Sequence, residues 1–102
     1  MPSFTTRVEL HNAKYDDYQV LHKAMEAERF SRVILGDNGI LYHLPLAEYT
    51  SAGDVSYTDV RAFAERAAMR TGCSFEILVT EATNRAWQGL KPVAVAAAAN
   101  RI

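Results

Sequence analysis

Three histidines and one arginine are the side chains best suited to moving a proton beside a charged group. Arg7 and His11 lie in a β-like run near the N-terminus, whereas His22 lies in a helical pattern. His43 lies in a second β-like run. Imidazole exchanges protons near neutral pH, and a guanidinium can hold a phosphate through paired hydrogen bonds. The candidate catalytic residues are therefore His22, His11, His43 and Arg7.

A basic cluster lies at the expected end of the first helix. Lys23, Arg29 and Arg32 come close together in the sequence and could contact phosphates. The net charge of the chain is -1, so any nucleic-acid binding must rely on such a local patch. A structural interpretation of His22 also stays open. In it, His22 lies at the boundary of the apolar face of the helix and is partnered by Glu26, one helical turn later. We take Lys23, Arg29 and Arg32 as candidate phosphate-binding residues.

Several kinds of chemistry lack their sequence signatures. The chain has no glycine-rich phosphate loop, no Gly-x-Ser-x-Gly, no His-Glu-x-x-His and no Cys-x-x-Cys. Cys73 is the only cysteine, so neither an intramolecular disulfide nor a zinc site of the usual spacing is expected. We expect no metal and no cofactor. With no signal-like or membrane-spanning run, a cytoplasmic protein is the expectation.

Hydrophobic periodicity predicts the elements that must position these residues. Apolar and polar residues alternate over residues 4–11, which predicts a strand, and helical spacing over residues 15–28 predicts the first helix. Two short β-rich runs, 32–35 and 40–44, flank the turn residues 36–39 and predict a hairpin. Residues 50–54 are interpreted as a polar loop.

The second half of the chain repeats the pattern. Ser56 and Asp59 resemble a capping box, Gly72 supplies a helix stop, and residues 74–81 alternate as a fourth strand. The βαββαβ order predicts an α+β ferredoxin-like sandwich, with a four-stranded antiparallel sheet and two helices on one face. We expect one domain over residues 1–91. The alanine-rich tail, 92–102, is expected to be a swapped strand, a short helix or disordered.

The uncovered face of the predicted sheet is the most informative surface. In the ferredoxin-like order the first and third strands are adjacent, so Arg7, Glu9 and His43 are expected to converge. Two structural interpretations stay open beside proton transfer. One is a solvated salt bridge with a surface histidine, and the other is a homodimer interface that uses Leu41 and Leu78.

Several core and turn patterns resemble a bacterial family. They are FTTRVELHNA (4–13), the Phe30-Ser31 pair that closes the first helix, YHLP (42–45) with AEY (47–49), and ILVTEA (77–82) before Trp87. Together these are similar to the GhoS-type antitoxins of type V toxin-antitoxin systems. The similarity runs from about residue 4 to residue 91.

The resemblance implies a ferredoxin-like fold and an endoribonuclease that cleaves the messenger of a small membrane toxin. In that family a basic side chain about two turns before the closing Phe-Ser pair is important for activity, and here that register falls on His22. A related CRISPR adaptation nuclease binds metal through an acidic residue after its first strand, where this chain has His11 and Asn12. Metal-independent attack by the RNA 2′-hydroxyl is therefore the expected chemistry.

Two functional hypotheses follow. The first is an antitoxin-like RNA-binding protein, with the histidines handling protons and Arg7, Arg29 or Arg32 stabilising the phosphorane. The second is a non-catalytic, homodimeric protein-interaction module that associates through its sheet face or its tail, in a phage or mobile-element setting.

Overall fold

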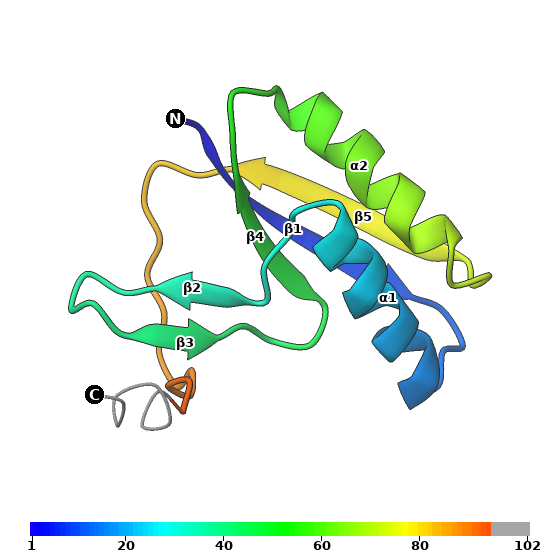
Figure 1. Cartoon of the computed structure of the whole chain (residues 1–102), viewed down its shortest axis with the longest axis horizontal. Helices are drawn as coiled ribbons and strands as arrows, with labels where there is room; N and C mark the ends of the chain where they lie inside the picture. The colour runs from blue at the N-terminus through cyan, green and yellow to red at the C-terminus, as the bar shows by residue number, and fades with distance from the viewer. Residues whose placement is uncertain (95–102) are drawn as a thin grey trace.

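Two helices cover one face of a three-stranded antiparallel sheet (Figure 1). The structure is a computed structural model, and it describes residues 1–94. The sheet has the order β4-β1-β5, with β1 over Ser3–Leu10, β4 over Glu48–Ala52 and β5 over Phe75–Glu81. Helix α1 spans Tyr15–Ala27 and helix α2 spans Tyr57–Met69. A separate two-stranded sheet contains β2 (Val33–Leu35) and β3 (Leu41–His43). The mixed α+β class is confirmed.

Strand β1 buries alternate side chains, as its sequence pattern predicts. Phe4, Thr6 and Val8 are fully buried, and Leu10 is nearly so, whereas Arg7 on the other face is exposed. Successive strand residues point to opposite faces, so this alternation places one row of β1 under the helices. The other row, which carries the candidate residue Arg7, lies on the open face.

Both helices pack a narrow apolar face on β1. Helix α2 begins at a capping box in which the Ser56 hydroxyl accepts from the Asp59 N–H at 3.1 Å, and the Asp59 carboxylate accepts from the Ser56 N–H at 3.0 Å. Gly72, with φ of 77°, follows the helix in the left-handed conformation that glycine adopts without strain. The predicted start and stop signals of α2 are thus confirmed. The buried residues of the two helices are Leu21, His22, Ala24 and Met25 in α1, and Val60, Ala64, Ala67 and Ala68 in α2.

Strand β4 lies where the sequence predicted a loop. Residues 50–54 were interpreted as a polar connection, but residues 48–52 pair antiparallel with β1, with Thr50 opposite Thr5 and Glu48 opposite Arg7. Tyr49 has no exposed surface, and the burial of its ring stabilises this pairing. Residues 48–52, not 40–44, therefore occupy the place beside β1, which corrects the prediction.

A four-stranded sheet does not form within residues 1–94. At the outer edge of β4 only Ser31 and Thr50 pair, through two backbone hydrogen bonds of 2.8 Å. The chain then turns away from the sheet at Arg32, and the next residues pair with β3 instead, Val33 opposite His43. The predicted hairpin exists, but as a separate sheet beside the sandwich (Figure 1).

The segment after β5 runs to the hairpin and pairs with β3. The His43 N–H donates to the Lys91 carbonyl at 2.9 Å, and the Val93 N–H donates to the Leu41 carbonyl at 2.8 Å. Trp87 packs its ring edgewise on Tyr42, with 5.7 Å between the ring centroids. Pro92 and Val93, the start of the predicted tail, thus lie along the hairpin. The predictions made for the rest of the tail concern residues 95–102, which lie outside the described residues.

Helix α1 ends in a Schellman motif that has an arginine at the glycine position. The Phe30 N–H donates to the Met25 carbonyl, and the Arg29 N–H donates to the Glu26 carbonyl. Arg29 has φ of 72°, in the left-handed region that costs a side chain-bearing residue about 1–2 kcal/mol. Such strain outside the core makes Arg29 a candidate functional residue.

We expect Arg29→Gly to be more stable than Arg29→Ala by about 0.5–1 kcal/mol. Both variants remove the guanidinium, but only glycine relieves the backbone strain at this position. Urea denaturation followed by circular dichroism measures the difference between the two unfolding free energies. Equal stabilities, or a less stable glycine variant, would show that the left-handed conformation carries no strain.

Candidate functional site

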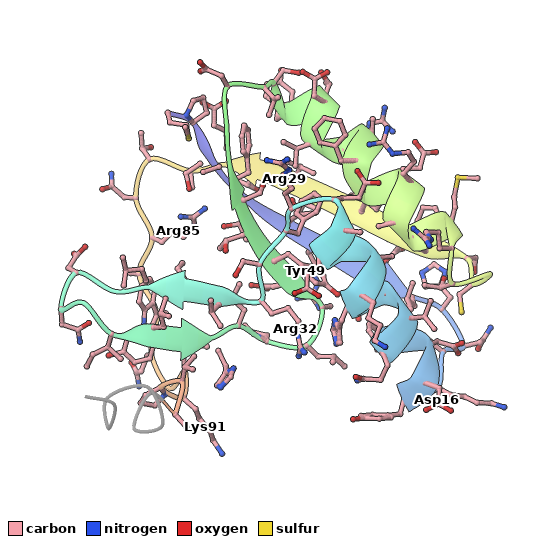
Figure 2. The ribbon with its side chains drawn as sticks, in the orientation of Figure 1. Asp16, Arg29, Arg32, Tyr49, Arg85 and Lys91 are labelled. Atoms are coloured by element: carbon pink, nitrogen blue, oxygen red, sulfur yellow. The ribbon has the colours of Figure 1, made fainter. Side chains whose placement is uncertain are left out.

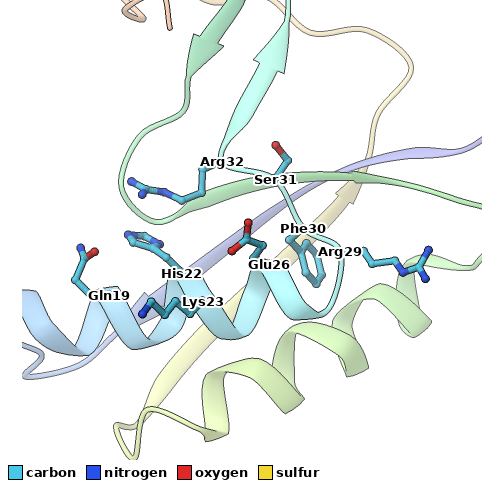
Figure 3. A pocket seen from close by; sticks show the side chains of 8 residues that line it. All are labelled: Gln19, His22, Lys23, Glu26, Arg29, Phe30, Ser31 and Arg32. Atoms are coloured by element: carbon cyan, nitrogen blue, oxygen red, sulfur yellow. The ribbon is translucent and has the colours of Figure 1, made fainter. Parts of the chain in front are cut away.

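A cavity of about 530 Å³ lies beside helix α1, where the chain leaves the helix for β2 (Figure 3). We call it the α1 cavity. It brings together four of the seven residues predicted from the sequence, namely His22, Lys23, Arg29 and Arg32. The complete lining is Gln19, His22, Lys23, Glu26, Arg29, Phe30, Ser31 and Arg32.

His22 is the buried polar group of this cavity. Its side chain is 8% exposed, and its Nδ1 lies 2.7 Å from the hydroxyl oxygen of Tyr49, which has no exposed surface. Its Nε2 is also buried and has no hydrogen-bond partner among residues 1–94. The expected partner of His22, Glu26, lines the same cavity but forms no hydrogen bond to His22 within the described residues. The partner is Tyr49 instead.

Counting donors and acceptors assigns the hydrogens of the His22–Tyr49 pair. If the Tyr49 hydroxyl donates to Nδ1, only the Nε2–H of His22 lacks a partner within the described chain. The opposite assignment leaves both the hydroxyl hydrogen and Nε2 unpaired. Each unpaired buried polar group costs about 1–3 kcal/mol, which favours the first assignment. His22 therefore holds a buried, neutral N–H donor that has no acceptor among residues 1–94, and the residue itself lines the cavity.

The electrostatics of the cavity keep His22 neutral. Burial, and then the nearby positive charge of Arg32, lower the pKa of His22 from 6.5 to about 4. Burial likewise raises the pKa of Tyr49 above its ordinary value. In Figure 3 the side chain of Arg32 lies next to the imidazole of His22. A neutral donor and a fixed cation are thus held side by side.

The cations of the α1 cavity are not neutralised by carboxylates. Lys23, Arg29 and Arg32 form no ion pair within residues 1–94, and Glu26 is the single carboxylate in the lining. Arg29 also follows the C-terminus of α1, where the helix dipole favours a positive charge. The cavity therefore combines three free cations with one acid. The arginines that do form ion pairs lie elsewhere, at Arg7, Arg61 and Arg66.

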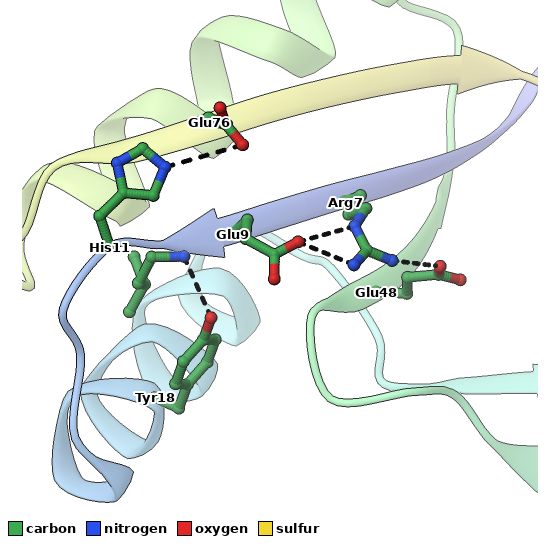
Figure 4. A network of polar contacts seen from close by, with 7 residues as sticks. Arg7, Glu9, His11, Tyr18, Glu48 and Glu76 are labelled. Carbon is green, nitrogen blue, oxygen red and sulfur yellow. Dashed lines mark hydrogen bonds and ion pairs between the residues drawn. The ribbon is translucent and has the colours of Figure 1, made fainter.

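Arg7 lies on the open face of the sheet and is held by two carboxylates (Figure 4). Its Nε and Nη2 donate to Glu9 at 3.0 and 2.7 Å, and its Nη1 donates to Glu48 at 3.2 Å. The Glu9 carboxylate, and then Glu48, raise the pKa of Arg7. Because both carboxylates compete for the guanidinium, Arg7 is poorly placed to hold a phosphate.

His11 and His43 lie away from the α1 cavity. His11 Nδ1 lies 3.2 Å from the Ser74 hydroxyl, and its Nε2 lies 3.6 Å from the Glu76 carboxylate (Figure 4). His43 lies on the hairpin, whereas the neighbours of β1 are β4 and β5. The predicted convergence of Arg7, Glu9 and His43 therefore does not occur, because β4 takes the place expected for residues 40–44. No described contact or cavity joins the three histidines.

The apolar pair expected on the open face is also separated. Leu78 is 65% exposed and lies on β5, an edge strand of the three-stranded sheet. Leu41 lies on β3, and its carbonyl accepts from the Val93 N–H. The two side chains belong to different sheets, so the joint apolar patch inferred from the predicted topology is not formed.

Two residues of functional interest were missed by the sequence interpretation. Tyr49 was missed because residues 50–54 were interpreted as a loop, although Ala47, Tyr49 and Ser51 alternate with Glu48 and Thr50 as in a strand. Arg85 was missed because the chain after β5 carries it back to Thr5 in β1, and no local sequence pattern predicts the course of that segment.

No protein-family model matches the chain, and no curated protein matches it as a relative. Within residues 1–94, no group of three or more histidine, cysteine or acidic side chains is placed to hold a metal ion. None of the helices in the described part of the chain is long and apolar enough to cross a membrane. The site is thus defined by its own geometry, as a cavity with free cations and a buried neutral imidazole.

The lowered pKa of His22 predicts a pH-dependent stability. Between the ordinary pKa of 6.5 and the folded-state value of about 4, the unfolded chain takes up a proton that folded His22 does not. The free energy of unfolding should therefore fall by about 2–4 kcal/mol as the pH falls through this range. Urea denaturation at a series of pH values measures the slope.

His22→Gln should flatten this slope, since an amide does not titrate and can still bond to Tyr49. His43→Gln, an exposed position, serves as the matched control and should keep the wild-type slope. If His22→Gln retains the full slope, burial does not hold His22 neutral.

Proposed function

We propose that the protein is an antitoxin-like RNA-binding protein, similar to the GhoS type, which holds the RNA backbone in the α1 cavity. The observation that carries the proposal is the buried Nε2–H of His22 beside the guanidinium of Arg32, neither of which has a partner in the described part of the chain. An unpaired buried donor is costly, and a phosphate oxygen is an acceptor that would satisfy it. The sequence resemblance supplies RNA as the polymer.

The chemistry of a phosphodiester fits the lining of the α1 cavity. Its two free oxygens accept hydrogen bonds and carry one negative charge, so one phosphate can bond to His22 and pair with Arg32 at once. Lys23 adds a positive charge near His22, whereas Arg29 lines the far side of the cavity and its guanidinium points away from His22 (Figure 3). Because the net charge of the chain is -1, binding depends on this local field and should weaken as salt rises.

Lys23→Gln combined with Arg32→Gln should weaken RNA binding roughly tenfold and lower the salt dependence of binding by about 0.7 per lost phosphate contact. Fluorescence anisotropy with a labelled oligouridylate measures both quantities. Arg61→Gln with Arg70→Gln is the matched control, because it changes the net charge equally in helix α2 and at its C-cap. Equal losses in the two double variants would contradict a specific site.

The same geometry supports a cleavage form of the proposal that is centred on His22 alone. In it the RNA 2′-hydroxyl gives its proton to water as its oxygen attacks the phosphorus, and the bond from phosphorus to the 5′-oxygen breaks. His22, in its protonated form, gives a proton to the leaving 5′-oxygen and takes one back from solvent, and the RNA is left with a 2′,3′-cyclic phosphate. A bound phosphate supports this role, because its negative charge raises the low pKa of His22. His11 and His43 have no part, since the structure holds them elsewhere.

Incubation of the protein with RNA in EDTA tests the cleavage form. We expect metal-independent cleavage that is lost in His22→Gln and kept in His43→Gln. Intact RNA at high protein excess, with binding retained, would leave the protein as a binder and would rule out the cleavage form.

The resemblance also implies a ferredoxin-like topology, and the strand order supports a variant of it. The order β5-β1-β4 is followed by the Ser31–Thr50 bridge at the place of the fourth strand. We propose that the fourth strand is reduced to this bridge and that β2 and β3 form an added hairpin. The alternative function, a homodimeric interaction module, is supported by one feature, the exposed Leu78 on the edge strand β5.

A further inference from the structure

A second cavity, of about 400 Å³, adjoins the α1 cavity at Arg29 and Ser31, which line both. We call it the β4-edge cavity. Its other lining residues come from the start of β1, from β2, from the end of β4 and from the segment after β5. They are Ser3, Val33, Ile34, Leu35, Thr50, Ser51, Ala52 and Arg85.

The β4-edge cavity exists because the chain leaves the sheet after Ser31. A full fourth strand would cover the outer edge of β4, but only the Ser31–Thr50 bridge does so. Ser51 lies opposite the buried Phe4, and Ala52 lies opposite Ser3 on the other face. The cavity therefore reaches from the helix face of the sheet around the edge to the open face.

Arg85 forms the far wall of this cavity. Its Nε donates to the Thr5 hydroxyl at 2.7 Å, and its Nη2 lies 3.2 Å from the Ser3 hydroxyl. Within residues 1–94 no carboxylate pairs with Arg85, so its charge is not neutralised and its remaining N–H groups are free to donate. Figure 2 shows Arg29 and Arg85 on opposite sides of β4.

The cavity also holds an unpaired hydroxyl. The Ser51 oxygen is buried and has no hydrogen-bond partner in the described part of the chain. The neighbouring hydroxyl of Thr50 is already engaged, because it donates to the Val33 carbonyl at 2.8 Å. Ser51 thus adds a hydroxyl without a partner in the described chain to a lining that also contains Arg29 and Arg85.

We propose that the β4-edge cavity is a second phosphate subsite, which receives the next part of a single-stranded RNA whose first phosphate lies in the α1 cavity. The inference rests on the proposed function and extends it. Arg29 is shared by the two cavities, so a chain of phosphates can pass from one to the other. Arg85 pairs with the second phosphate, and Ser51 hydrogen-bonds to a ribose 2′-hydroxyl.

Two subsites predict a preference for polymers over single nucleotides. Single strands bend freely enough to follow the edge of β4 from one face to the other, which a duplex does not. An acidic peptide would also pair with the two arginines, but it lacks a 2′-hydroxyl for Ser51. We therefore assign single-stranded RNA as the substrate class.

The test measures affinity against RNA length, with oligouridylates of about two to about twelve nucleotides. Wild type should gain affinity steeply once the RNA spans both cavities. Arg85→Gln should lose most of this gain, roughly tenfold at the longest length. Arg7→Gln is the control, because it removes an arginine of the same face that Glu9 and Glu48 already hold.

Ser51→Ala is a second variant, which tests the same subsite even if Arg85→Gln disturbs the segment after β5. The Ser51 hydroxyl is buried and has no protein partner in the described chain, so its loss should maintain or raise thermal stability while it weakens binding of RNA more than of the matching DNA. Polyglutamate serves as a competitor. Displacement of RNA by polyglutamate at equal charge would overturn the assignment of RNA.

The outcomes separate the two proposals. If Lys23→Gln with Arg32→Gln weakens binding but Arg85→Gln and Ser51→Ala do not, the second subsite is wrong and the α1 cavity stands. If none of these changes weakens binding, the proposed function fails as well.

Discussion

The hydrogen bond between His22 and Tyr49 is the contact on which the rest of the site depends. It joins helix α1 to strand β4 through two side chains that are both buried. Phe30 packs edgewise on Tyr49, with 6.3 Å between ring centroids, so the residue that closes α1 holds the same tyrosine in place. Because the tyrosine occupies Nδ1, the only free donor of the imidazole is Nε2, and it is held beside Arg32.

The pairing of β4 with β1 also leaves open space around this contact. Tyr49 enters the core only because residues 48–52, and not residues 40–44, pair with β1. The hairpin β2–β3 is then free to leave the sheet, which opens the edge of β4 after the Ser31–Thr50 bridge. Both cavities lie where the chain leaves the edge of β4. Arg29 lines both of them, and its backbone has a strained, positive φ.

Sequence patterns predicted those helices and strands whose signals lie within a few neighbouring residues. They failed where packing between distant parts of the chain determines the structure. Alternation in β1 and β5, the capping box at Ser56 and the stop at Gly72 are each contained in a few residues, and each is present in the structure. Strand β4 was missed because Thr50 and Ser51 are small and polar, while the burial of Tyr49 depends on α1 and Phe30. His22, Lys23, Arg29 and Arg32 were selected from charge and chemistry, and the structure gathers them because they share the end of one helix. Arg85 could not be placed, since its position follows from hydrogen bonds to β1 residues some eighty positions earlier.

The most direct test follows the side-chain nitrogen signals of His22 by NMR while a short oligouridylate is added. We expect that the Nε2 signal of His22 shifts on binding, that Nδ1 remains bonded to Tyr49, and that the pKa of His22 rises from about 4 toward 6.5. RNA that binds while the Nε2 signal and the pKa of His22 stay unchanged would contradict the account, because the phosphate would then lie elsewhere.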